Sequence, residues 1–215
     1  QAGCSQGVIT KLAEKGYIEK CELYTPAPCT KPDTAYGGLS LTEQQQSAVR
    51  VLHRQFDEGG FAPVLLDGVA GAGKTETYFE AVARALEQGR QVLILLPEIT
   101  LSNAFLERFE ARFGTAPGLW HSALSPAQRR TTWRGVAGGR TKVVVGARSA
   151  LFLPYADLGL IVVDEEHDPA FKQEDNVIYN ARDMAIVRAH QGGFPILLVS
   201  ATPSAETMAN AWAGR

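Results

Sequence analysis

Short apolar runs alternate with longer segments of helical periodicity along most of this chain. The runs lie at residues 64–66, 92–96, 118–120, 143–145, 160–163 and 196–199. Continuous runs of Val, Ile and Leu are typical of strands that are buried on both faces, and helical segments between such strands allow them to run parallel. The pattern therefore predicts an α/β fold in which a mostly parallel sheet has helices on both faces.

The pattern is different before residue 39. Apolar side chains at Val8, Ile9, Leu12 and Ala13 predict a short amphipathic helix that ends near Gly16, and residues 17–20 then read as extended. Three prolines and two glycines interrupt the polar stretch between residues 24 and 38, which predicts a linker. We therefore expect a small unit at 1–24, a linker at 25–38 and the α/β lobe at 39–215.

The chain has 215 residues, of which 45% are hydrophobic, and a formal charge of −2. These values suit a soluble domain with a well-buried core, and the near-neutral charge requires any nucleic-acid binding to come from a local face. No apolar run reaches the roughly 18 residues of a membrane span, and the start does not resemble a signal peptide.

The cysteines Cys4, Cys21 and Cys29 match no zinc spacing and are too few for a disulfide framework. A reduced, cytoplasmic protein with no membrane partner is therefore expected. Because the chain begins at Gln1 without a Met, we also expect a fragment of a longer protein.

Residues 68–75 read GVAGAGKT and match the phosphate-loop pattern G-x-x-x-x-G-K-[ST]. The motif lies between an apolar run at 63–67 and a helical pattern at 75–87, which is the strand, turn and helix start that such a loop requires. Lys74 is expected to reach the β- and γ-phosphates of a nucleoside triphosphate, and the Thr75 hydroxyl to bind Mg²⁺. The candidate nucleotide-binding residues are Gly68, Val69, Ala70, Gly71, Ala72, Gly73, Lys74, Thr75 and Glu76.

A second motif, DEEH at 164–167, directly follows the apolar run at 160–163. Acidic side chains at the carboxyl end of a parallel strand are expected beside the phosphate loop, because ligands of such folds bind at that edge. Asp164 would complete the Mg²⁺ site with Thr75, and Glu165 would position or deprotonate the attacking water. Together with Lys74, the catalytic candidates of this motif are Asp164, Glu165 and His167.

The third motif, SAT at 200–202, follows the apolar run at 196–199. Hydroxyl side chains at this edge are able to hydrogen-bond the DEEH carboxylates, so Thr202 is a candidate for coupling them to the γ-phosphate. The alternative is that the segment only begins a helix with Ser204 as its N-cap. The two interpretations are compatible.

These motifs in this order resemble the superfamily 2 DEXH-type DNA helicases. Longer segments narrow the resemblance to the primosomal replication-restart helicases: LPEITL at 96–101, HSALS at 121–125, VVVGARSALFLP at 143–154, LGLIVVDEEHDPAFKQED at 158–175, YNARDMAIVRA at 179–189 and SATPSAET at 200–207. The resemblance covers about residues 39–215, and residues 8–22 resemble the end of a winged-helix domain. It implies a RecA-like P-loop NTPase lobe that binds ATP and Mg²⁺ and acts on single-stranded and forked DNA.

In these helicases a glutamine amide reads the adenine base, and residues 41–42 with Gln45 resemble that segment. The triplet of Gln44, Gln45 and Gln46 leaves the register open, and Gln45 is the interpretation we favour. Thr42 also suits the cap of a helix that starts here.

The resemblance also implies two strand-end loops that hold a single DNA strand by its phosphates. One contains Pro97, Glu98 and Thr100, and the other contains Gly146, Arg148 and Ser149. Thr100 has an alternative role as the N-cap of a helix at 101–113.

A further segment resembles the aromatic-rich loop that links DNA contact to ATP hydrolysis in this family. Residues 169–171 read Pro-Ala-Phe where the family often has a serine and a tyrosine. Exposed rings stack on unpaired bases and cations meet phosphates. The alternative is that the side chains of Phe171 and Tyr179 are buried and anchor the core. The candidates are Phe171, Lys172, Gln173, Tyr179 and Arg182.

For the parent protein the resemblance implies an ATP-dependent 3′-to-5′ DNA helicase that acts in primosome assembly at stalled forks, with primosome proteins and single-stranded-DNA-binding protein as partners. The family's second motor lobe, arginine fingers and cysteine-rich zinc module lie beyond the matched segment. We therefore expect zinc only in the parent, with none of its ligands in this chain, and little ATP hydrolysis by this chain alone. Two alternatives remain open: a related superfamily 2 translocase and a catalytically silent nucleotide-binding module.

Overall fold

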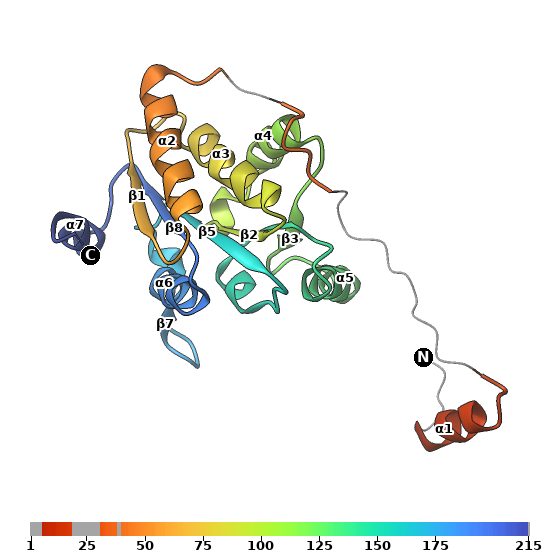
Figure 1. Cartoon of the computed structure of the whole chain (residues 1–215). Coiled ribbons are helices and arrows are strands. Elements are labelled where there is room, and N and C mark those ends of the chain that lie inside the picture. The colour runs from red at the N-terminus through yellow and green to blue at the C-terminus, as the bar shows by residue number, and fades with distance from the viewer. Residues whose placement is uncertain (1–5, 19–30, 38–39, 215) are drawn as a thin grey trace.

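The computed structural model describes residues 6–18, 31–37 and 40–214 (Figure 1). Its helices are α1 (Gln6–Glu14), α2 (Glu43–Glu58), α3 (Lys74–Glu87), α4 (Asn103–Phe113), α5 (Pro126–Ala137), α6 (Ala181–Gly192) and α7 (Ala205–Trp212), with short 3₁₀ turns η1 (Glu98–Thr100), η2 (Arg148–Phe152) and η3 (Pro169–Phe171). Its strands are β1 (Pro63–Asp67), β2 (Gln91–Leu95), β3 (Gly118–Trp120), β4 (Val143–Gly146), β5 (Leu158–Asp164), β6 (Lys172–Gln173), β7 (Tyr179–Asn180) and β8 (Ile196–Ser200).

Six strands form one sheet in the order β1-β8-β5-β2-β4-β3, and every neighbouring pair is parallel. All six correspond to the apolar runs of the sequence, so the predicted α/β fold is confirmed. The short antiparallel pair β6–β7 was not predicted. Parallel pairing places all six carboxyl ends, and the loops that follow them, at the same edge of the sheet.

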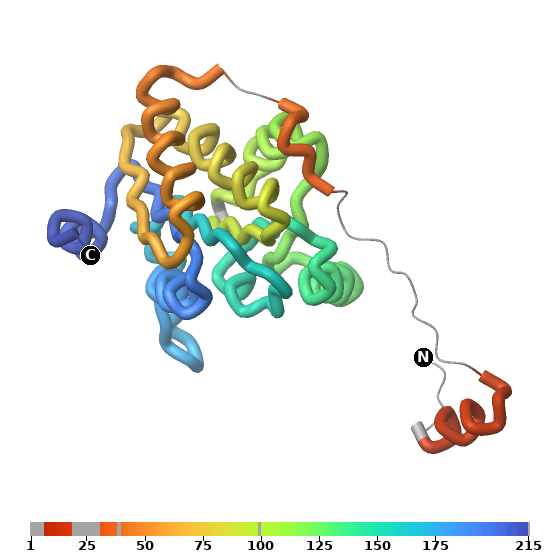
Figure 2. The backbone as a smooth tube through the Cα atoms, viewed as in Figure 1, coloured from red at the N-terminus to blue at the C-terminus, as the bar shows by residue number. Residues whose placement is uncertain are grey.

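Helices cover both faces of the sheet, as Figures 1 and 2 show. On one face, α2, α3 and α4 pack on Val92, Ile94 and Val162 around the fully buried ring of Phe79. On the other face, η2 and α6 pack on Leu93, Ile161 and neighbouring strand residues. The central strand β2 is buried along its whole length, which explains its apolar run from Val92 to Leu95, while the buried amide of Gln91 at its start donates to the carbonyls of Val136 and Thr141.

The helix predicted around residues 8–13 is present as α1. The expected extended segment at 17–20 and the predicted linker at 25–38 each lie half outside the described residues, and Cys4, Cys21 and Cys29 lie wholly outside them. The division at residues 24 and 38 and the winged-helix interpretation therefore remain predictions. In the part of the chain that the structure describes, none of the helices is long and apolar enough to cross a membrane.

Capping side chains fix the starts of α2, α4 and α7. Thr42 caps α2 in a reciprocal capping box with Gln45, and Ser204 caps α7 through the Thr207 amide, as the sequence predicts. Thr100 as the cap of α4 is wrong, because Thr100 itself ends the 3₁₀ turn η1 and Ser102 makes that contact instead. The Thr100 hydroxyl donates to the Pro97 carbonyl, at 2.8 Å.

Replacing Phe79 by alanine tests the helical layer above the sheet. The Phe79 ring makes edge contacts with Phe105, Phe109 and Phe113, and its loss leaves a cavity. We expect Phe79→Ala to lower the free energy of unfolding by about 3–5 kcal/mol in urea titrations. Trp212→Ala, at a side chain that is 80% exposed, is the control and should unfold like the original chain. Equal stability of the two variants would contradict this packing.

Candidate functional site

The three sequence motifs meet at the carboxyl ends of β1, β8 and β5, which are adjacent in the sheet. Asp67 pairs in register with Ser200, and Asp164 pairs with Val199. Backbone hydrogen bonds continue beyond the strands, since the Gly68 amide donates to the Ser200 carbonyl at 3.3 Å and the Glu166 amide donates to the Val199 carbonyl at 3.1 Å. The expected proximity of the phosphate loop, DEEH and SAT is therefore present.

The phosphate loop is shaped by glycines that no other residue replaces easily. Gly71 and Gly73 both have φ of +77°, and a Cβ atom on Gly73 would lie 2.2 Å from the Gln45 amide nitrogen. The loop leads into the first turn of α3, whose free N–H groups and dipole favour an anion. The Lys74 ammonium lies over the loop and donates to the carbonyls of Gly68 at 2.7 Å and Val69 at 3.2 Å.

Gln45 is the glutamine of the triplet that reaches the phosphate loop. Its Nε2 donates to the Ala72 carbonyl at 2.8 Å, while its Oε1 accepts the Thr42 amide at 2.8 Å. Gln46 instead donates to the Leu41 carbonyl, and Gln44 is exposed. This geometry favours the register that the sequence suggested. Glu76, another nucleotide candidate, forms an ion pair with Arg108 of α4.

Asp164 lies at the end of β5, where a buried tyrosine orients it. The Tyr78 hydroxyl donates to Asp164 Oδ2 at 3.0 Å, and the Glu165 amide donates to Oδ1 at 3.0 Å. Burial raises the pKa of the Asp164 carboxyl, and the charge of Glu165 adds to this, while the Tyr78 hydrogen bond opposes it. Sequence reasoning missed Tyr78, although its position four residues after Lys74 places it one helical turn into α3.

Glu165 has φ of +55°, in the left-handed region that non-glycine residues rarely adopt. Such strained residues are concentrated at functional sites. Its carboxylate lies 3.7 Å from His167 Nδ1, and the same ring nitrogen lies 2.8 Å from the Ser200 hydroxyl. The backbone turn at Glu165 thus brings the DEEH side chains against the end of β8.

Glu166, which the sequence did not single out, is the most enclosed charge of the motif, with a side chain that is 0% exposed. Its oxygens accept the Ser204 amide at 2.6 Å, the Ser204 hydroxyl at 3.2 Å and the Thr207 hydroxyl at 2.9 Å. Arg182 completes the set with an ion pair at 3.1 Å. This network, which we call the Glu166 cluster (Glu166, Arg182, Ser204 and Thr207), joins the end of β5 to α6 and α7.

The Glu166 cluster changes two assignments. Arg182 as a contact for DNA phosphate is wrong in this structure, because its guanidinium is held by Glu166, Asp183 and the Ser204 hydroxyl. Hydroxyl contacts to DEEH do occur at this edge: Ser200 of SAT contacts His167, and Ser204, two residues beyond SAT, contacts Glu166. The Thr202 side chain is exposed and its amide donates to the Ser200 hydroxyl at 3.0 Å, so its coupling role stays a prediction.

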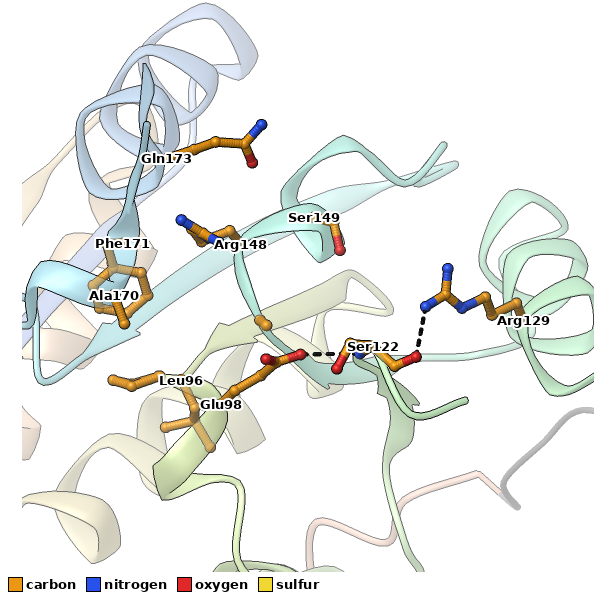
Figure 3. Close-up of a pocket in the computed structure, with 11 residues that line it drawn as sticks. Leu96, Glu98, Ser122, Arg129, Arg148, Ser149, Ala170, Phe171 and Gln173 are labelled. Carbon is orange, nitrogen blue, oxygen red and sulfur yellow. Dashed lines mark hydrogen bonds between the residues drawn. The ribbon is translucent and has the colours of Figure 1, made fainter. Parts of the chain in front are cut away.

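A hollow of about 350 Å³ lies at the same edge beyond β2 and β4 (Figure 3). The loops after these strands face each other across it, with Arg148 and Gln173 toward one side and Arg129 toward the other. It thus brings together residues of all three segments that the sequence assigned to DNA. Its lining is Leu96, Pro97, Glu98, Ser122, Arg129, Ala147, Arg148, Ser149, Ala170, Phe171 and Gln173.

Glu98, which lines this hollow, and Gly146, which directly precedes its lining residue Ala147, determine the shape of its loops. Glu98 accepts the Ser122 amide at 3.0 Å, and hydrogen bonds from the Ser122 side chain and from its backbone amide to the ionised carboxylate hold the Glu98 pKa below its ordinary value. An ionised carboxylate repels phosphate, so the Glu98 side chain positions the Ser122 loop rather than a DNA phosphate. A Cβ atom on Gly146 would lie 2.4 Å from the Trp120 carbonyl, which explains the glycine there.

Phe171 as an exposed stacking ring is wrong, and the core-anchor alternative is confirmed. Its side chain is 1% exposed and packs in the core beneath the sheet. Tyr179 is half-buried and meets the exposed Phe152 ring edge-on, at 5.3 Å between centroids. Lys172 is exposed and pairs with Glu174, while its carbonyl accepts a hydrogen bond from Arg148.

Comparison with known proteins agrees with this arrangement. A family model described as DEAD/DEAH box helicase matches residues 42–211. Replication restart protein PriA of Rickettsia felis is 49% identical over 175 residues, which are 81% of this chain and 26% of that protein. The same-named protein of Bacillus subtilis is 36% identical over 212 residues, covering 98% of this chain and 26% of that protein. The chain therefore spans about a quarter of the length of the curated relatives it matches.

Solved structures agree in fold. A structure of RecG bound to a three-way DNA junction has a TM-score of 0.61 and 22% identity, covering 97% of this chain and 25% of that one. The helicase MrfA bound to DNA has a TM-score of 0.53 and 14% identity, covering 87% of this chain and 28% of that one. At these identities the likeness concerns the fold alone.

The Tyr78–Asp164 hydrogen bond is testable by removing one oxygen. Tyr78→Phe keeps the buried ring and leaves Asp164 Oδ2 without this donor. A hydrogen bond to a charged group contributes about 1.5–3 kcal/mol, so we expect Mg²⁺-dependent nucleotide binding to weaken by about 10-fold or more. Tyr155→Phe, which removes a buried hydroxyl bonded to the Ala150 carbonyl on the other face, is the matched control. Identical nucleotide affinities of the two variants would rule out this role for Tyr78.

The Glu166 cluster predicts a loss of stability on neutralising one buried charge. Glu166→Gln keeps the side-chain volume but leaves Arg182 with only the exposed Asp183 as a counter-charge, and it turns an amide donor toward other donors. We expect the free energy of unfolding to fall by about 3–5 kcal/mol, as for other broken buried ion pairs. Glu206→Gln, an exposed carboxylate on α7, is the control and should change little in the same urea titration. A stability equal to that of the control would mean that the cluster does not hold α6 and α7 to β5.

Proposed function

The chain belongs to the DEAD/DEAH box helicase family, and we propose that it is the nucleotide-binding first motor lobe of an ATP-dependent 3′-to-5′ DNA helicase of replication restart. One observation carries this proposal: the phosphate loop, DEEH and SAT share one edge of the sheet with the hollow between the β2 and β4 loops. The nucleotide and the DNA strand would therefore bind to loops that leave the same rigid β-sheet.

We assign the phosphates of ATP to the loop at 68–75 and the first turn of α3. The loop amides and the helix dipole would bind the β-phosphate. Lys74 would exchange its bonds to the Gly68 and Val69 carbonyls for bonds to β- and γ-phosphate oxygens. Gln45, beside the loop, would contact the adenine edge.

Thr75 and Asp164 suit Mg²⁺, because both offer the oxygen ligands that this ion prefers. Among the described residues, no three His, Cys, Asp or Glu side chains form a metal-binding group, so the remaining ligands would be phosphate oxygens and water. The ion, when bound, would neutralise charge on the phosphates.

Glu165 is the residue best placed to orient or deprotonate the attacking water. His167 and Ser200 lie beside it and connect it to the end of β8. The Glu166 cluster then links the same loop to α7, and Thr202 lies on the segment between them. We infer that γ-phosphate contact and the position of α7 are coupled through this segment.

For DNA, we assign the strand-end loops around the 350 Å³ hollow to the backbone of a single strand. Backbone amides and hydroxyls of Pro97–Thr100 and Gly146–Ser149, the Arg148 guanidinium and the Gln173 amide are suitable phosphate donors. Lys172 and Tyr179 lie on the adjoining β6–β7 hairpin. This arrangement supports the binding of a single DNA strand by loops that are anchored in the β-sheet.

The remaining assignments concern the whole protein. We propose that the parent acts on forked DNA in the cytoplasm with primosome proteins and single-stranded-DNA-binding protein, that it carries zinc outside this chain, and that residues 1–24 belong to a winged-helix domain. In such motors, arginines of a second lobe complete the charge stabilisation of phosphoryl transfer. We therefore expect this chain alone to bind nucleotide but to hydrolyse it slowly.

The nucleotide site is tested by titrating a fluorescent ADP analogue with Mg²⁺ into the chain and its Lys74→Ala variant. We expect saturable binding that weakens at least about 10-fold in the variant, because a charge-assisted contact to phosphate is lost. Lys142→Ala is a matched control, since this ammonium also donates to a backbone carbonyl, that of Gly89. Lys142 lies outside both the phosphate loop and the 350 Å³ hollow. Absence of binding by the unchanged chain would favour the catalytically silent alternative.

A further inference from the structure

Positive charge is segregated to one part of this chain. Between Glu110 and Asp157 the sequence contains seven of the 21 Lys and Arg residues and none of the 23 Asp and Glu residues. This stretch forms β3, α5, β4 and η2, at the end of the sheet opposite β1 and α7 (Figure 1). A chain with a formal charge of −2 thus has a local basic face, which is what binding to a polyanion requires.

The outer face of α5 combines this charge with exposed indole surface. Arg130, Trp133 and Arg134 are spaced to lie on one side of the helix, and the Trp133 side chain is 49% exposed. Together with Trp120 and Arg129 they line a shallow hollow of about 230 Å³. We call these five residues the α5 platform.

The residues that give the platform its character are not used elsewhere in the structure. Trp133 belongs to neither of the two cores. Among the residues that the structure describes, Arg130 and Arg134 form no ion pair, whereas Arg108, Arg112 and Arg182 all do. An exposed ring between unneutralised guanidinium groups is the combination that binds unpaired nucleotides, through base stacking and phosphate contact.

The α5 platform continues from the hollow between the β2 and β4 loops. Arg129 lines both, and its guanidinium donates to the carbonyls of His121 and Ser122. Trp120 of the platform donates from its indole nitrogen to the Ser149 hydroxyl, at 3.1 Å, and Ser149 lines the first hollow. A DNA strand in the first hollow would therefore reach Trp133 by following the protein surface past Arg129.

We propose that the α5 platform binds unpaired nucleotides of a single DNA strand, with a base stacked on Trp133 and the neighbouring phosphates held by Arg130 and Arg134. This inference rests on the proposed binding of DNA to the strand-end loops and extends that path onto α5. It assigns a stacking ring to this lobe in place of Phe171, which is buried. Since the indole face accepts any base, the platform would bind without sequence preference.

The test is the affinity of the chain for a fluorescein-labelled oligodeoxythymidylate of about 12 nucleotides, within the range of single-strand site sizes, measured by anisotropy. We expect Trp133→Ala to weaken binding by about 5-fold or more, and Trp133→Tyr to retain most of the affinity, because one stacked base is lost only in the first. With an abasic strand of the same length, Trp133→Ala and the unchanged chain should bind equally. The double variant Arg130→Ala/Arg134→Ala should lower the slope of log affinity against log salt by about 1.4.

Trp212→Ala, which removes an exposed indole at the other end of the sheet, is the control and should bind as the unchanged chain does. Normal binding by Trp133→Ala, with binding lost in Arg148→Ala, would overturn the platform and leave the proposed DNA contact of the loops intact. Failure of the unchanged chain to bind any strand would overturn both. Because the Arg130, Trp133 and Arg134 side chains are exposed, the variants of the platform are expected to unfold at the same urea concentration as the original chain.

Discussion

Parallel pairing of β1, β8 and β5 obliges three separate loops to leave the sheet at the same edge. The pairing also fixes the position along the strand direction at which each loop begins, since Asp67, Ser200 and Asp164 end their strands within one residue of each other. Side chains alternate between the two faces of a strand, so a one-residue shift of β5 would exchange the faces to which Ile161 and Val162 point. Burial of both faces prevents such a shift, and the site therefore inherits its geometry from the core.

Helices on the two faces of the sheet then orient the acidic motif from opposite sides. Tyr78 of α3 donates to Asp164, while the Glu166 cluster joins the next turn to α6 and α7. A buried carboxylate is costly unless donors surround it, and Glu166 has four of them, from three residues. Asp164 and Glu166 of DEEH are thus tied to different helical layers. Movement of one layer relative to the other would change the position of Glu165, which lies between them.

Much of this arrangement follows from local sequence. The six strands were predictable because short apolar runs that alternate with helical segments are typical of buried parallel strands. The phosphate loop was predictable because its glycine spacing encodes a backbone shape. Phe171 and Arg182 were misjudged for a common reason: they lie at the two ends of the segment that joins η3 to α6, and their exposure is decided by where α6 packs, which no local pattern contains. Thr100 lost the cap of α4 to Ser102 because a 3₁₀ turn shifted the helix start. Glu166 was missed because an acidic residue inside an acidic motif gives no sign of being buried.

The amide of Gln45 is held at both ends, since its oxygen accepts the Thr42 amide and its nitrogen donates to the Ala72 carbonyl. A primary amide has two N–H donors and two acceptor positions on its oxygen, so one donor and one acceptor position are left over after these bonds. The side chain is therefore ordered before a ligand arrives, and a group that binds it would not lose affinity to the entropy of fixing its rotamer. The same two bonds tie the first turn of α2 to the phosphate loop, so that the start of this helix and the loop form one preorganised unit.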